Sequence, residues 1–243
     1  AMSARLKRGS KAGRLSCLEA LGALGGEEAQ EAMRSALQHR DPDVRIAAMK
    51  ALVESGAEVS IGQVMDMVQN GRLPPSRLLA ELVRQMAGAA PCEAVEALAS
   101  GRLSPFGRAM LLDALGSCGD YAVLPTLIEA AGDADAEART AALRGLGRLQ
   151  HPAAGTAIAA GLSDPAWPVR AAAAEAAGHA RLVRLIEPLV GLLNDPEWWV
   201  RFRASEALAI FGKPGVERLR QIAQGEEGGA QRTASMALAE RRL

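Results

Sequence analysis

Residues 195–208 read Asp-Pro-Glu-Trp-Trp-Val-Arg-Phe-Arg-Ala-Ser-Glu-Ala-Leu, and this stretch has counterparts elsewhere in the chain. It begins with an Asp-Pro pair, which suits the start of a helix, and continues with apolar residues at helical spacing around an Arg. The same pattern occurs in DPDVRIAAMKAL (41–52), DAEARTAALRGLG (135–147) and DPAWPVRAAAAEAAG (164–178). Self-similarity of this kind is typical of a repeat protein.

Aligning the segments on their Arg gives a register that extends through the whole chain. Successive members of the series are 31 or 32 residues apart: Arg14, Arg45, Arg77, Arg108, Arg139, Arg170, Arg201 and Arg232. Residues one before and three, four and seven after each Arg are largely apolar, so one helical face repeats with the same period. A helix pair cannot bury such a face alone, whereas stacked pairs bury it continuously.

Each period has room for two helices and two short turns. In the fifth full period we expect one helix over 152–162 and a second over 165–177, joined by Ser163-Asp164-Pro165, where Asp164 caps the second helix. Asp41-Pro42 and Asp195-Pro196 repeat this turn. Glycines eleven residues after the anchor Arg are expected to end the second helices, because Gly adopts the left-handed conformation without strain: Gly25, Gly56, Gly88, Gly119 and Gly212.

Composition agrees with an all-α fold. Ala and Leu, the strongest helix formers, dominate the chain, and aromatic residues make up only 3% of it. The sequence therefore predicts an α-solenoid of about seven to eight helical hairpins with a 31-residue period, containing seven first helices and eight second helices. Residues 14–243 are expected to form a single continuous solenoid after a basic N-terminal segment over residues 1–13.

The period, the Asp-Pro turn and the Asp to Val-Arg spacing resemble HEAT repeats, specifically the short bacterial type that also occurs in phycobilin lyase subunits. The resemblance covers nearly the whole chain. It implies a polar ladder in which an Asp six positions before the Arg takes part, and Asp133, Asp164 and Asp195 keep this spacing. His39 and Arg102 stand in the place of the acid before Arg45 and Arg108, so the ladder is not expected in the N-terminal half. The anchor arginines are interpreted as structural.

Charge, cysteine content and chain ends give few functional signals. The 28 basic and 28 acidic residues balance, and no apolar run has the length of a membrane span. The three cysteines lack a metal-ligand spacing, and Cys17 and Cys118 are expected to pack as small hydrophobes. A cytoplasmic location is the default expectation.

The N-terminal segment allows two interpretations. Ala1-Met2 is interpreted as an expression scar. The basic cluster from Arg5 to Arg14 indicates either a solvated end or the remnant of a membrane-anchored protein. Membrane contact is expected only through this basic segment.

No catalytic constellation is visible. The three histidines fall at different places in their periods, and no His-Glu dipeptide of the kind that binds iron in the hydroxylase of deoxyhypusine occurs. We therefore expect neither enzymatic activity nor a cofactor or metal. Some HEAT-like solenoids bind DNA, and Trp167, Trp198 and Trp199 near Arg201 and Arg203 invite that comparison. The zero net charge makes nucleic acid an unfavourable partner.

The stripe opposite the expected core indicates where a partner would bind. Positions −2, +2, +5 and +9 from each anchor Arg are expected to be exposed. An apolar centre on this stripe, flanked by charge and aromatic residues, is the usual form of a protein-binding site. The candidate residues are Leu79, Leu82, Phe106, Met110, Trp167, Trp199, Arg203 and Glu206. The alternative is that the third period is rotated and buries its leucines, since Ser76 and Glu81 stand at core positions.

The sequence thus favours a non-catalytic interaction scaffold that binds a protein or peptide on the solenoid surface. Two alternatives stay open: a nucleic-acid-binding solenoid and an accessory subunit like those of phycobilin lyases. Of Trp198 and Trp199, adjacent on one helix, at least one must be exposed, and Trp199 is expected to be that residue.

Overall fold

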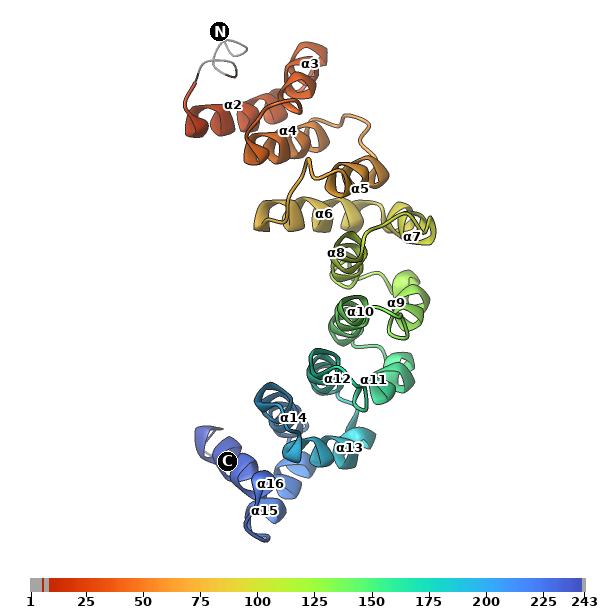
Figure 1. Ribbon diagram of the computed structural model, residues 1–243, viewed down its shortest axis with the longest axis vertical. Coiled ribbons are helices and arrows are strands. Elements are labelled where there is room, and N and C mark those ends of the chain that lie inside the picture. The colour runs from red at the N-terminus through yellow and green to blue at the C-terminus, as the bar shows by residue number, and fades with distance from the viewer. Residues whose placement is uncertain (1–5, 7–8, 242–243) are drawn as a thin grey trace. The chain divides into compact units, whose positions relative to one another are not determined.

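The structure is a computed structural model that describes residue 6 and residues 9–241. The described residues form 15 α-helices and four short 3₁₀ segments, with no strand. First and second helices alternate as the period predicts, which confirms the all-α, seven-plus-eight arrangement (Figure 1). The second helices are α2 (Lys11–Leu24), α4 (Pro42–Glu54), α6 (Arg77–Ala89), α8 (Pro105–Leu115), α10 (Ala136–Leu149), α12 (Trp167–His179), α14 (Trp198–Ile210) and α16 (Gly229–Arg241).

The first helices are shorter. They are α3 (Glu27–Ala36), α5 (Ile61–Gln69), α7 (Pro91–Ala99), α9 (Leu124–Ala130), α11 (Gly155–Gly161), α13 (Ile186–Gly191) and α15 (Lys213–Ala223). Three of them are preceded by a 3₁₀ turn, η1 (Tyr121–Val123), η2 (Pro152–Ala154) and η3 (Val183–Leu185), and η4 (Leu192–Asn194) follows α13. None of the described helices is long and apolar enough to cross a membrane.

The chain divides into two compact units, residues 1–107 and 108–243, with the boundary inside α8. A single continuous solenoid over 14–243 therefore stays a prediction. The N-terminal unit buries Leu18, Met33 and Leu52 in its core. In the C-terminal unit, Leu143 and Leu208 of second helices are fully buried, and α10, α12 and α14 follow one another on one side of the first helices (Figure 1).

Much of the predicted N-terminal segment, including Arg5, Lys7 and Arg8, lies outside the described residues. Of its described members, Lys11 begins α2 and forms ion pairs with Asp41 and Asp43 at the start of α4. This lysine is thus held by the fold of the N-terminal unit.

Helix starts follow the predicted turn chemistry in part. Asp41 caps α4 by accepting the N–H of Asp43, with Pro42 in the first helical position, as predicted. The expectation was wrong for Asp164 and for Asp195, because α12 begins only at Trp167 and α14 only at Trp198. Each Asp instead closes the turn before the helix: Asp164 accepts the N–H of Ala166 at 2.8 Å, and Asp195 accepts that of Glu197 at 2.9 Å.

Close contact between second helices depends on small residues eight positions after the anchor Arg. A Cβ added to Gly116 would lie 2.2 Å from the Cα of Gly145, and one added to Gly147 would lie 2.8 Å from that of Ala176. Gly178 meets Ala207 in the same way at 3.0 Å. In the C-terminal unit, therefore, the backbones of successive second helices pack directly against each other, because the residues at these contacts are Gly or Ala.

Helix ends also follow the register, with one correction. Gly25, Gly56, Gly119 and Gly212 have positive φ at the position eleven residues after the anchor, as predicted. Gly88 does not, because α6 continues to Ala89. Two non-glycine residues also have positive φ at the same register position, Gln150 with φ 54° and Arg181 with φ 49°.

The choice of Arg77 as an anchor was wrong. Its helix α6 buries Leu79, Leu82 and Val83, which lie three, six and seven residues after Ser76. Counted from Arg45, α4 buries Ala48, Ala51 and Leu52 at the same offsets. Ser76 therefore occupies the place of the Arg, 31 residues after Arg45, and its Oγ caps α6 by accepting the N–H of Leu79. The exposed Arg77 lies one position away.

Candidate functional site

The polar ladder of the C-terminal unit joins each repeat to the next. Arg139 donates from Nε and Nη2 to both carboxylate oxygens of Asp164, at 2.8 and 2.9 Å, across 25 residues of sequence. Arg170 makes the same paired contact with Asp195 at 2.7 and 2.9 Å. The planar guanidinium matches a carboxylate with two parallel hydrogen bonds, so these two contacts fix both distance and orientation. Nε of Arg108 also lies 2.8 Å from the Asp133 carboxylate, but it makes no hydrogen bond there. The expectation that the ladder would be missing at Arg108 was therefore wrong, because Asp133 of the next repeat supplies the carboxylate.

The third nitrogen of each ladder guanidinium binds its own repeat. Nη1 of Arg170 donates to the carbonyl oxygens of Asp164 and Pro165, at 2.9 and 3.1 Å. The Asp six positions before each Arg thus offers its backbone to that Arg and its carboxylate to the preceding one. The predicted ladder is present in this unit, with each carboxylate paired between repeats.

The carboxylates of Asp164 and Asp195 are ionised and strongly held. Burial of the Asp195 carboxyl raises its pKa, but hydrogen bonds from Arg170 and from the N–H of Glu197, with the charge of Arg170, lower it by more. The pKa of Asp164 is lowered in the same way through Arg139 and the N–H of Ala166. The hydrogen bond to Asp195 raises the pKa of Arg170, so both partners stay charged near neutral pH.

At Arg45 in the N-terminal unit, the contacts to backbone carbonyls are present and the contact to a carboxylate is replaced by a carbonyl. Nη1 of Arg45 donates to the carbonyls of His39 and Arg40, while its Nε donates to the carbonyl of Arg72 at 2.7 Å. The imidazole of His39 shapes the turn by accepting the N–H of Asp41 at 3.0 Å, as an Asp would, but it offers no carboxylate. The expectation that the ladder fails here was right for Arg45.

A charged groove lies on the second helices of the C-terminal unit. A cavity of about 330 Å³ is lined by residues of α10, α12 and α14: Arg144, Arg148, Glu175, Ala176, His179 and Arg203. Most of these residues stand at +2, +5 or +9 of the predicted stripe. The prediction that the +2 position is exposed is wrong for Ala141 and Ala172, because both side chains are buried.

Most cations of this face are matched by carboxylates. Arg203 lies 2.9 Å from Glu206 and 3.7 Å from Glu175, and Glu206 is also 3.1 Å from Arg241. Arg148 pairs with Asp113 at 2.6 Å. The face therefore presents alternating charges rather than a basic stripe, which disfavours the phosphate backbone of a nucleic acid.

Exposed aromatic rings border this charged face at the start of α14. Trp198 stacks on Phe202 with ring centroids 5.2 Å apart, and Trp199 meets Trp198 edge-on at 4.7 Å. Trp198 is 45% and Trp199 51% exposed, so the prediction for Trp199 is confirmed and Trp198 is exposed as well. Both rings present large apolar surfaces to solvent.

The apolar centre predicted in the third period was wrong. Leu79 and Leu82 are completely buried in the core of the N-terminal unit, because α6 follows the strict register from Ser76. The alternative of a rotated helix is therefore correct for these two residues. Phe106 is 38% exposed near the start of α8, and Met110 on the same helix is half-buried.

The predicted residues of the C-terminal unit lie at or near its surface. Trp167 is 40% exposed at the start of α12, and Arg203 and Glu206 are half-buried and paired with each other on α14. Three residues were not predicted from the sequence: Phe202, whose ring joins the two tryptophans, and Arg148 and His179 of the groove. The +9 register position of Arg148 and His179 was the signal that pointed to them.

Two further expectations concern isolated side chains. Cys17 is buried in the core of the N-terminal unit, as predicted, but Cys118 is only half-buried in a turn, where its Sγ accepts the N–H of Asp120 at 3.4 Å. Among the described residues, no group of three or more His, Cys, Asp or Glu side chains is arranged to hold a metal ion.

Comparison with known families agrees with this geometry. The family model of HEAT repeats matches residues 1–83, 93–178 and 155–239. The chain belongs to the HEAT-repeat family. No curated protein matches it over its sequence.

Solved structures show the same fold at low sequence identity. The X-ray structure of Escherichia coli YibA is 16% identical, with a TM-score of 0.53, covering 99% of this chain and 91% of that one. Kap121p bound to Pho4p is 16% identical with a TM-score of 0.50, covering 98% of this chain and 33% of that one. The CpcE–CpcF complex of phycocyanin lyase from Nostoc sp. PCC7120 is 20% identical with a TM-score of 0.45, covering 88% and 77%. At these identities the likeness concerns the fold alone.

Proposed function

We propose that this HEAT-repeat chain is a non-catalytic scaffold that binds a protein or peptide on the second-helix face of its C-terminal unit. The observation that carries the proposal is the exposed aromatic cluster of Trp198, Trp199 and Phe202 beside the paired charges of Arg203 and Glu206. Large aromatic rings next to a polar rim are the usual anchors of protein interfaces. A folded chain gains nothing from exposing two tryptophans to water.

The charge pattern favours a polypeptide over DNA or RNA. Arg203 and Arg148 are held by carboxylates, so a nucleic acid would have to displace Glu175, Glu206 and Asp113 before it gained phosphate contacts. A polypeptide with mixed charges can exchange partners with both members of each pair.

The test compares Trp199→Ala with Tyr121→Ala in an affinity purification from the source cells. Tyr121 is a matched control because it is also an exposed aromatic residue, 59% accessible, and lies on η1, outside the cluster of Trp198, Trp199 and Phe202. We expect a partner that the unaltered protein and Tyr121→Ala both retain and Trp199→Ala loses, with equal melting temperatures for the three proteins.

Two results would overturn the proposal. One is a partner retained equally by all three proteins, which would place the interface elsewhere. The other is tight binding of a fluorescent DNA duplex at moderate salt, measured by anisotropy, which would favour the nucleic-acid alternative.

A further inference from the structure

Arg201 is the last member of the ladder and uses only part of its guanidinium. Its Nη1 donates to the carbonyl oxygens of Asp195 and Pro196, at 2.7 and 2.9 Å, as the other ladder arginines do with their own turns. Among the described residues, no carboxylate lies within ion-pair distance of Arg201. The edge formed by Nε and Nη2, which binds Asp164 in Arg139 and Asp195 in Arg170, thus has no such partner here.

The sequence explains why the ladder stops. The residue 25 positions after Arg201 is Glu226, within Gly225-Glu226-Glu227-Gly228, and the Asp-Pro pair of the earlier turns is missing. Glu226 is exposed. The next second helix is nevertheless in register, because α16 begins at Gly229, 31 residues after the start of α14 at Trp198. The helix that should bring the next carboxylate is in place, but the carboxylate is not.

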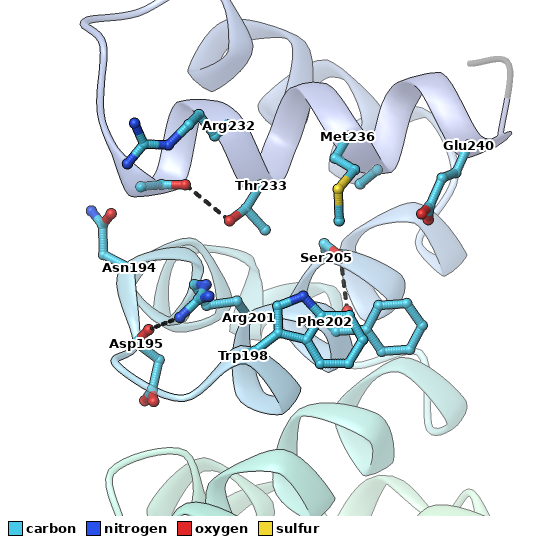
Figure 2. A pocket seen from close by; sticks show the side chains of 12 residues that line it. Asn194, Asp195, Trp198, Arg201, Phe202, Ser205, Arg232, Thr233, Met236 and Glu240 are labelled. Atoms are coloured by element: carbon cyan, nitrogen blue, oxygen red, sulfur yellow. Dashed lines mark hydrogen bonds between the residues drawn. The ribbon is translucent and has the colours of Figure 1, made fainter.

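A cavity of about 430 Å³ lies at this point between α14 and α16 (Figure 2). Arg201, Asn194 and Thr233 give it a polar end, and Arg232 adds a second cation to its lining. Two acidic residues, Asp195 and Glu240, also line the cavity. Trp198, stacked on Phe202, and Met236, which is 47% exposed, form an apolar wall. Figure 2 shows these side chains around one hollow, with Arg201 bonded to the Asp195 carbonyl.

Fixed geometry prepares Arg201 for a carboxylate. Its two bonds to the turn hold the guanidinium plane in place, so binding costs little additional side-chain entropy. The neighbouring carboxylate of Asp195 is already committed to Arg170 and to the N–H of Glu197. In Arg139 and Arg170 of the same chain, the edge formed by Nε and Nη2 binds an aspartate carboxylate.

We propose that this cavity binds an aspartate-bearing turn of a partner polypeptide, which completes the ladder from outside. The aspartate carboxylate pairs with Nε and Nη2 of Arg201, and an apolar residue beside it packs against Trp198 and Met236. The site is separate from the groove of Arg144, Arg148 and His179, since it lies between α14 and α16 at the turn side of the helices.

The probe is a capped peptide with the sequence of residues 161–166, Gly-Leu-Ser-Asp-Pro-Ala, which contains the turn that pairs with Arg139. It contains no Trp, so binding is measured as a change in the protein's tryptophan fluorescence, to which Trp198 contributes. We expect saturable binding, weakened at least about tenfold when Asn replaces the Asp of the peptide, because a charged hydrogen-bonded pair is lost. Equal binding of both peptides, or binding of neither, would overturn the proposal.

Two protein variants assign the binding to Arg201. Arg201→Gln is expected to lose the preference for the Asp peptide, whereas Arg220→Gln keeps it, since Arg220 is an exposed arginine on α15 that does not line the cavity. A preference that survives in Arg201→Gln would contradict the assignment. Melting curves establish that both variants are folded.

A gain of structure provides an independent test. The double change Glu226→Asp, Glu227→Pro restores the Asp-Pro turn 25 residues after Arg201 and supplies the missing carboxylate from within the chain. We expect the melting temperature to rise and peptide binding to be lost, although Arg201 is unchanged. Peptide binding that persists at full strength in a variant with a raised melting temperature would overturn the proposal.

Discussion

The two units of this chain use the same helical repeat but hold successive repeats together with different groups. In the C-terminal unit, Arg139 and Arg170 reach the carboxylates of the following repeats, and Gly116 and Gly147 let the second helices touch. In the N-terminal unit, Arg45 reaches only carbonyl oxygens. Gly22 approaches Ala51 as the C-terminal glycines approach their neighbours, but Val53 stands where the next glycine would be. The difference shows that a periodic Arg does not make a ladder by itself. The residue 25 positions later decides whether it forms.

The largest effect is expected from breaking the C-terminal ladder. Asp195→Ala removes the partner of Arg170 and the acceptor that closes the turn, and both side chains are largely buried, at 5% and 14% exposure. Leaving one charge of a buried pair without its partner costs about 3–5 kcal/mol. The measurement is the free energy of unfolding in urea.

The matched control for Asp195→Ala is Asp43→Asn in the N-terminal unit. Asp43 pairs with Lys11 at the surface, where water screens both charges. Little change in stability is expected for this control. Equal losses for the two variants would show that the ladder stabilises the C-terminal unit no more than a surface ion pair does.

A smaller loss is expected where helices touch. Gly116→Ala places a Cβ against the backbone of Gly145, and such overpacking costs about 1–3 kcal/mol. Gly88→Ala is the same chemical change in α6 of the N-terminal unit, where no atom lies within 4 Å of the added Cβ. It is expected to stabilise the chain by about 0.4–1 kcal/mol, because Ala restricts the unfolded chain. Thermal or urea unfolding of the two variants is expected to show changes in stability of opposite sign.

Acid is expected to weaken the ladder less than truncation does, since a protonated Asp keeps its shape and its turn hydrogen bond. The arginines and backbone N–H groups hold the pKa of Asp164 and of Asp195 below the ordinary value of about 3.9, in spite of burial. A lowered folded-state pKa contributes stability that is fully present above the unfolded value and is lost as the pH falls through the folded one.

The pH prediction is checked by urea unfolding at pH 7 and at successive values below 4. The double variant Asp164→Asn, Asp195→Asn has no titrating group at these positions, so its stability is expected to fall less steeply in the acid range. An unchanged acid slope would mean that other carboxylates account for the loss of stability.

The sequence predicted the architecture well because its signals are local and repeated. The Asp41 cap and the left-handed glycines such as Gly56 determine helix boundaries through contacts within a few residues. The predicted register was wrong at Arg77, because it was assigned from the position of the Arg and not from the apolar face of the helix. The buried residues of α6 have the register of the other repeats when they are counted from Ser76. For the same reason Leu79 and Leu82 were assigned to the surface although they form core.

The candidate site was predicted only in part, because its geometry joins residues of different repeats. The exposed Trp199 could be predicted from adjacent helical positions alone. The open edge of Arg201 could not, since it depends on which group of the next repeat reaches the guanidinium in the folded chain. A comparison of Glu226 with Asp195, one period apart, was the available signal.

The smallest effect concerns the helix ends, where some repeats use glycine and others do not. Gly56 has a positive φ at the end of α4, and Gln150 and Arg181 also have positive φ at the ends of α10 and α12. That conformation costs a non-glycine residue about 1–2 kcal/mol, and Gly loses about 0.5–1 kcal/mol more backbone entropy on folding. Gln150→Gly and Arg181→Gly are therefore each expected to stabilise the chain by about 0.5 kcal/mol.

The reverse change sharpens this last prediction. Gly56→Ala adds a Cβ that meets no atom within 4 Å, so any loss of stability comes from the backbone conformation alone. We expect a loss of about 1 kcal/mol, measured by urea unfolding beside the two glycine variants. If Gly56→Ala lost stability while Gln150→Gly gained none, the side chain of Gln150 would have to stabilise its left-handed conformation through contacts of its own. The ends of α10 and α12 would then do without glycine at no cost in stability.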